Sequence, residues 1–177
     1  MSVDAAVPSR GKYDVLVNSR NGSVTVDGVE ARTVEARSMN GRITLERLQA
    51  EAVDASTKNG SIYASGELGN ATIETANGSI SASLNYEHDG SLKMSTGNGS
   101  IKVEIPKSPA VQYTVNAGAV NGAVKVDIDD AGTVKSESPH TGHRRQASVT
   151  VPGPEGSDKS VDVEARAVNG SITVVTA

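Results

Sequence analysis

The side chains that could bind a metal in this chain are two histidines in one short segment. His140 and His143 are three residues apart, and imidazole nitrogens at short spacing can bind a transition metal. Such a site needs further ligands, and no third ligand follows nearby in the sequence. We therefore interpret His140, His143, Arg144 and Arg145 as part of a solvated loop that could contact a partner. We expect no metal and no cofactor.

The acidic residues offer a second possibility. Glu35 and Asp54 occupy equivalent positions in successive repeats of the chain, and Glu74 lies close to the next one. A row of carboxylates could hold a cation or a sugar. Arg37 lies two residues from Glu35, so a solvated face of mixed charge is the favoured interpretation. The sequence contains no recognisable phosphate-binding glycine loop and no recognisable pair of a nucleophile and a base. We therefore expect no catalytic residues and no enzyme.

Seven Asn-Gly pairs form the framework that would position any site. They are Asn21-Gly22, Asn40-Gly41, Asn59-Gly60, Asn77-Gly78, Asn98-Gly99, Asn121-Gly122 and Asn169-Gly170. The spacings are 19, 19, 18 and 21 residues, followed by 23 and 48. A period near 19 is typical of repeat proteins, whose units bury their apolar faces by stacking. Asn tolerates a positive φ and Gly has no Cβ, so each pair predicts a turn.

Apolar and polar residues alternate on both sides of every Asn-Gly pair. Val34 and Ala36 precede Asn40, for example, and Ile43 and Leu45 follow it. The residue two places before each Asn is always Ser, Thr or Ala. Alternation with a period of two is typical of a half-buried strand, so each unit is predicted to be a strand, a turn and a second strand.

Two all-β architectures fit these units. The favoured one is a single-domain β-solenoid of stacked coils of about 19 residues with Asn-Gly corners. The alternative is an antiparallel β-meander or sandwich in which Asn-Gly forms hairpin turns. Seven hairpins would give about fourteen strands, which is more than a twisted open sheet commonly carries. The solenoid is therefore preferred.

The repeat predicts where the domain begins and where it is interrupted. We expect an N-terminal extension over 1–12 and a repeat domain over 13–177. An irregular loop insertion is expected at about 129–160, because that range is polar and rich in Gly and Pro. Within it, the alternation from Ala147 to Val151 could add one strand. The period then returns, and a final regular unit ends the chain.

Composition limits the interior and the chemistry. Phe, Trp and Cys are absent, and there are four Tyr. We expect an interior of Val, Ile, Leu and Ala without aromatic rings. The absence of Cys excludes disulfides, thiolate metal sites and a cysteine nucleophile. The formal net charge of -4, with both signs dispersed, gives no basic footprint, so no nucleic-acid partner is expected.

No segment has the apolar length of a signal peptide or a membrane span. We therefore expect no membrane insertion in this segment, and the pattern leaves the localisation unknown.

Three phrases carry a resemblance to a known family. They are Asn-Gly-Ser-Ile-Thr-Val at 169–174, Val-Glu-Ala-Arg-Thr-Val-Glu-Ala-Arg-Ser-Met-Asn-Gly at 29–41 and Val-Glu-Ala-Arg-Ala-Val-Asn-Gly at 163–170. Over residues 13–177 the chain resembles the putative adhesin repeat family, β-solenoid domains similar to auto-transporter adhesin heads. The resemblance implies a cell-surface or extracellular location. It implies no catalytic residues.

The expected function is a non-catalytic structural or adhesion-type module that presents a surface or loop to a surface protein or a glycan. The alternative is a self-assembling scaffold that resembles bactofilins and stacks end to end. It depends on the ends of the solenoid, which expose unpaired strand edges, and on the last coil, Ser171 to Val175, which is apolar and free of charge. A polysaccharide-active β-helix enzyme is the third possibility.

Overall fold

The computed structural model describes residues 3–4, 13–106, 110–128, 133–137, 145–154 and 158–176. Its regular secondary structure over these residues consists of β-strands. The strands are β1 (Val3–Asp4), β2 (Tyr13–Asn21), β3 (Val24–Asp27), β4 (Glu30–Asn40), β5 (Ile43–Asn59), β6 (Ile62–Glu67), β7 (Asn70–Asn77), β8 (Ile80–Leu84), β9 (Gly90–Asn98), β10 (Ile101–Ile105), β11 (Gln112–Asn121), β12 (Val124–Asp127), β13 (Thr133–Glu137), β14 (Arg145–Val151), β15 (Ser160–Asn169) and β16 (Ile172–Thr176). They form one sixteen-stranded sheet, so the all-β prediction is confirmed. β1 falls within the predicted extension 1–12 and pairs with β3.

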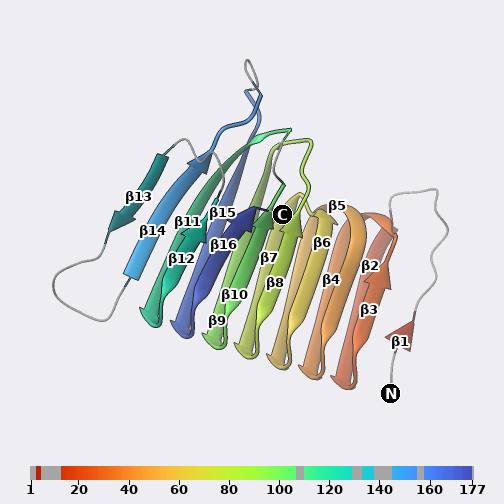
Figure 1. The fold of residues 1–177 in the computed structure, drawn as a ribbon. Helices are drawn as coiled ribbons and strands as arrows, with labels where there is room; N and C mark the ends of the chain where they lie inside the picture. The colour runs from red at the N-terminus through yellow and green to blue at the C-terminus, as the bar shows by residue number, and fades with distance from the viewer. Residues whose placement is uncertain are drawn as a thin grey trace.

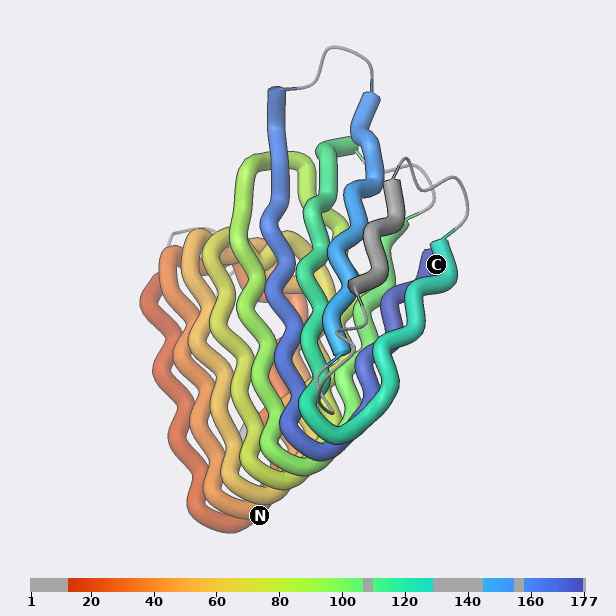
Figure 2. The backbone as a smooth tube through the Cα atoms, turned by 90° about the vertical axis from the view of Figure 1, so that its left-hand side faces the viewer, coloured from red at the N-terminus to blue at the C-terminus, as the bar shows by residue number. Residues whose placement is uncertain are grey.

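The sheet bends into two walls that meet at the Asn-Gly pairs (Figures 1 and 2). The long wall contains the strands that precede each Asn, in the order β2-β4-β5-β7-β9-β15-β11, followed by β14 and β13. The short wall contains the strands that follow each Gly, in the order β3-β5-β6-β8-β10-β16-β12. The seventeen-residue β5 contributes to both walls, because Arg47, at φ 52°, bends it. We call the two strands around one pair a unit and name it by its Asn.

Pairing runs between units and is parallel. Asn21 lies beside Asn40 in one ladder, and Val24 lies beside Ile43 in the other. The segments on the two sides of one Asn-Gly pair do not pair with each other: β2 pairs with β4, whereas β3 pairs with β1 and β5. β4 likewise pairs with the second half of β5, which belongs to the Asn59 unit, and β6 pairs with the first half of β5, which belongs to the Asn40 unit. A meander built on Asn-Gly hairpins would require antiparallel pairing within each unit. That alternative is therefore wrong for the described residues, and their winding is solenoid-like.

The core lies between the two walls and follows the predicted alternation. Val34, Ile43 and Leu45 are all buried. The expectation of an interior without rings is wrong, because Tyr86 and Tyr113 are also buried. Their rings make an edge-to-face pair with centroids 6.3 Å apart, and the Tyr86 backbone N–H donates to the Tyr113 hydroxyl at 3.1 Å. The longer connection between β8 and β9 brings Tyr86 into the interior, where the rings take the place of stacked aliphatic residues.

The stacking order differs from the order of the sequence. β15 pairs in parallel with β9 on one side and β11 on the other, and β16 pairs with both β10 and β12. In Figure 1 the blue β15 and β16 accordingly lie between the green β9 and β10 and the teal β11 and β12. The Asn169 unit is thus inserted between the Asn98 and Asn121 units. The prediction that Ser171 to Val175 forms an exposed end is wrong.

The range 129–160 holds two strands, β13 and β14, where the sequence predicts an irregular loop with one possible strand. β14 pairs antiparallel with β11, and β13 pairs antiparallel with β14. The predicted strand from Ala147 to Val151 is confirmed as part of β14. Because β14 occupies the outer edge of β11, the returning β15 can pair with β11 only on its inner side. The chain reversal that places β14 antiparallel to β11 thus also explains why the Asn169 unit is inserted between the Asn98 and Asn121 units.

Candidate functional site

The seven Asn-Gly pairs lie in one continuous row where the walls meet. Each Asn side-chain amide donates to the amide oxygen of the preceding Asn in the stack. The bonds are Asn40 to Asn21, Asn59 to Asn40, Asn77 to Asn59, Asn98 to Asn77, Asn169 to Asn98 and Asn121 to Asn169, all at 2.8 or 2.9 Å. The row thus follows the stacking order, with Asn169 between Asn98 and Asn121. These amides are already bound to one another.

The glycines of the row touch through their backbones. A Cβ on Gly99 would lie 2.0 Å from the Gly78 carbonyl oxygen, and a Cβ on Gly170 would lie 1.8 Å from that of Gly99. The small residue two places before Asn also has a contact here: buried Thr96 donates its hydroxyl to the Gly78 carbonyl at 2.9 Å. Close packing therefore explains why both positions accept only small residues.

The carboxylates predicted to face solvent lie together on the outer face of the long wall. Glu35 lies beside Asp54 in the ladder, and Arg37 forms ion pairs with both, at 3.1 Å to Asp54. Glu74 lies beside Ser56 on the neighbouring strand. The described residues contain no group of three or more side chains able to hold a metal ion. This arrangement has the mixed charge that the sequence predicts.

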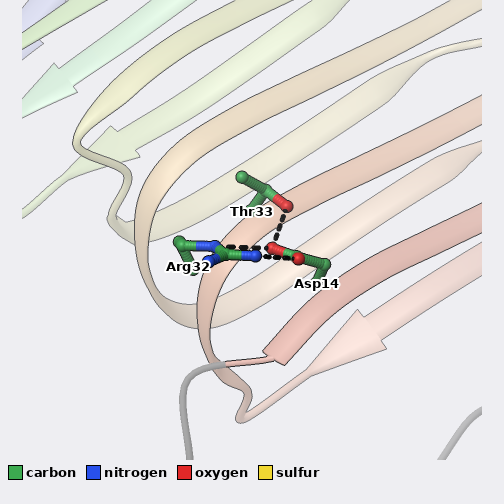
Figure 3. A network of polar contacts seen from close by, with 3 residues as sticks. All are labelled: Asp14, Arg32 and Thr33. Atoms are coloured by element: carbon green, nitrogen blue, oxygen red, sulfur yellow. Dashed lines mark hydrogen bonds and ion pairs between the residues drawn. The ribbon is translucent and has the colours of Figure 1, made fainter.

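A second charged cluster lies at the start of the long wall (Figure 3). The Arg32 guanidinium and the Asp14 carboxylate form a two-point ion pair, with Nε 3.0 Å from Oδ1, and the Thr33 hydroxyl donates to the same Oδ1 at 2.6 Å. The bond from Arg32, followed by the bond from Thr33, lowers the pKa of Asp14. Both members of the ion pair are exposed. The cluster therefore joins neighbouring strands without forming a recess.

Replacing Arg32 by Gln should raise the pKa of Asp14 toward its ordinary value of about 3.9. Because the folded pKa is lowered, the ion pair stabilises the fold above the unfolded pKa, and this contribution is lost as pH falls through the folded value. Carboxyl carbon NMR titration measures the shift directly. Arg37→Gln is the matched control, since Arg37 pairs with Glu35 and Asp54. An Asp14 pKa unchanged by Arg32→Gln would contradict the assignment.

The recessed part of the molecule is the outer face of the long wall. A hollow of about 500 Å3 lies over β9, β15, β11 and β14, and its lining includes Ser95, Asn116, Val120, Gln146, Arg166 and Val168. Val120 and Val168 are 41% and 50% exposed. A more open depression of about 760 Å3 continues over β2, β4, β5 and β7 and includes Met39, which is 48% exposed.

Charge and apolar surface meet in this hollow. Arg166 forms an ion pair with Glu164, two residues along β15. Val168 and Val120 stand directly before the paired Asn169 and Asn121, so the two valines lie on adjacent strands. The lining of the hollow thus combines two exposed valines with a charged pair. This combination suits noncovalent contact with a partner surface.

Most of the predicted partner loop is not among the described residues. His140, His143 and Arg144 lie outside the described residues, and Arg145 begins β14, where it is exposed beside Ala119. The sequence missed the hollow because its four strands come from residues 90 to 169. One signal was present: Val120 and Val168 are apolar at positions that the alternation assigns to solvent.

The family of the chain follows from a comparison with family models, in which residues 10–175 match the model described as Toastrack DUF4097. The chain belongs to the Toastrack DUF4097 family. No curated protein matches this Toastrack chain. No helix among its described residues is long and apolar enough to cross a membrane.

One solved structure resembles the Toastrack chain over nearly its whole length. It is the crystal structure of a putative cell adhesion protein from Clostridium sporogenes, with a TM-score of 0.59 and 12% sequence identity. The match covers 97% of this chain and 96% of the other. At this identity the likeness establishes a shared fold.

Proposed function

We propose that this Toastrack domain is a non-catalytic adhesion-type module that binds a partner on the outer face of its long wall. It would be built as a β-solenoid with coils of about 19 residues and Asn-Gly corners. The observation that carries the proposal is the hollow over β9, β15, β11 and β14, where two valines remain exposed beside an ion pair. The fold shared with a protein described as a putative cell adhesion protein supports the same class of function.

The lining of the hollow favours a protein partner over a glycan. Its described residues include no aromatic ring, although amphipathic rings are a common means of contacting a ligand with one apolar and one polar side. Exposed valines beside Arg166 are instead a surface that a protein can bury, because it combines apolar contact area with a charged group. A cell-surface location and a likeness to auto-transporter heads remain predictions from the sequence.

The test is a double substitution in the lining of the hollow, Val120→Lys with Val168→Lys. The fold should accept lysine here, because Lys58 and Arg20 occupy the equivalent position before Asn59 and Asn21. Burial of one valine is worth roughly 1.5–3 kcal/mol, so loss of both contacts should weaken binding at least about tenfold. The measurement is binding of the labelled intact chain to cells of its source organism, before and after protease treatment of the cells, and to a glycan array.

The matched control is Tyr63→Lys on the short wall. Tyr63 is exposed, and the equivalent position in β10, reached through Ser81 in β8, already carries Lys102. It should leave binding unchanged. If the chain bound neither cells nor glycans, adhesion would be contradicted. If the double substitution and Tyr63→Lys reduced binding equally, the assigned face would be contradicted. Binding that survives protease treatment and appears on the array would identify a glycan partner instead.

Assembly through the ends of the stack has less support than the sequence suggests. The apolar strand β16 pairs on both sides, so it offers no free edge. One end of the stack carries β12 in the short wall and β13 in the long wall, and the other end carries β2, which pairs with β4, and β1, which pairs with β3. The stacking scaffold therefore loses the apolar last coil as an exposed end, and it keeps only the strand edges at the two ends of the stack.

A further inference from the structure

The seven Asn-Gly pairs share a chemical liability that the fold controls. In an Asn-Gly sequence the glycine backbone nitrogen can attack the side-chain amide carbon of Asn, because glycine has no side chain to hinder the approach. The new N–C bond closes a five-membered succinimide. The Asn Nδ2 leaves as ammonia, taking up the proton lost by the glycine nitrogen. Water then opens the ring to aspartate or isoaspartate.

In six of the seven pairs the attacking nitrogen is engaged. Each glycine N–H donates to the carbonyl oxygen of the next Asn in the stack. The bonds are Gly22 to Asn40, Gly41 to Asn59, Gly60 to Asn77, Gly78 to Asn98, Gly99 to Asn169 and Gly170 to Asn121, at 2.9 or 3.0 Å. To react, such a nitrogen must first break this bond and leave the ladder. The stack therefore protects these six pairs.

The seventh pair, Asn121-Gly122, is different because its unit is the last in the row. The Gly122 N–H donates to no described residue, and both Asn121 and Gly122 are exposed. The side-chain amide nitrogen of Asn121 still donates to Asn169 at 2.9 Å. Its side-chain amide oxygen accepts no bond from the described residues. At the opposite end of the row, Asn21-Gly22 remains protected because Gly22 donates to Asn40 at 3.0 Å.

We propose that Asn121-Gly122 is the site at which the folded chain deamidates spontaneously, ahead of the other six pairs. The reaction needs no cofactor: the Gly122 nitrogen joins Cγ of Asn121, the bond from Cγ to Nδ2 breaks, ammonia leaves and water completes the conversion. The product carboxylate has no N–H to donate to Asn169. Its negative charge then faces the Asn169 amide oxygen, so the last bond of the asparagine row is lost.

The experiment follows all seven pairs in one sample. The intact folded chain is incubated in warm, mildly alkaline buffer, which favours the deprotonated glycine nitrogen, and then digested. Mass spectrometry with isoaspartate detection measures conversion at each Asn. Conversion at Asn121 should be at least roughly fivefold faster than at any other pair, the rate equivalent of one net backbone hydrogen bond.

The control is the same incubation in denaturant. There the protection disappears, so the deamidation rates of the seven pairs should converge. The ratio of the deamidation rate in the folded chain to that in the unfolded chain should be lower for each of the six protected pairs than for Asn121. A folded-state rate at Asn121 no higher than at Asn59 or Asn98, after division by the unfolded rates, would overturn the proposal. Fastest conversion at Asn21 would overturn it too, because end position alone would then explain the reaction.

Discussion

Replacing Gly170 by alanine should destabilise the fold by about 4 kcal/mol or more, which is exceptional for a change of one methyl group. The new Cβ would lie 1.8 Å from the Gly99 carbonyl oxygen. Neither backbone can move away, because Gly99 donates to Asn169 and Gly170 donates to Asn121, both at 3.0 Å. Relief of the clash requires breaking the ladder between two units. Urea unfolding followed by circular dichroism measures the loss.

Gly118→Ala is the matched control for this substitution. Gly118 lies in β11, and the nearest atom to a Cβ there is Cγ of Gln146 at 3.8 Å, an ordinary van der Waals contact. The change in unfolding free energy should stay within about 0.5 kcal/mol. Similar, small losses in the two variants would show that the glycine row is not the close contact described above.

Ile172→Asp should also cost about 4 kcal/mol or more, because a carboxylate would lose its water in the core without a partner. Ile172 is fully buried in β16. Since β16 pairs with both β10 and β12, the damage should spread in both directions. Hydrogen–deuterium exchange should therefore accelerate in Ile101–Ile105 and in Val124–Asp127. Continued protection of Ile101–Ile105 would contradict the insertion of the Asn169 unit.

Thr173→Asp is the control for the charge itself. The next residue along β16, Thr173, is partly exposed and lies between Lys102 and Lys125 on the neighbouring strands. A carboxylate there gains two nearby cations, so stability should change by less than about 1 kcal/mol. Its exchange pattern should match that of the unmodified chain.

Local structure was predictable because it repeats. The alternation around Asn40 specifies which residues are buried, and the Asn-Gly pairs specify where each unit turns. The small residues at the turn, such as Thr96, were predictable from their spacing, and the structure adds the hydroxyl bond to Gly78. The proposed binding face was harder to predict from the sequence. Val120 and Val168 break the alternation, but their adjacency depends on how distant segments pack.

The sequence by itself determined the strands around the seven Asn-Gly pairs, their inward faces and the position of each Asn-Gly turn, because these depend on residues a few positions apart. Only the tertiary structure decided the order of the units. Each unit presents the same ladder to its neighbours, so the local pattern is equally satisfied by several stacking orders. The choice is made by a contact between Asn98 and Asn169, which are 71 residues apart, and by β14, which occupies the outer edge of β11. That order leaves the Gly122 nitrogen without a described partner and places the two valines side by side.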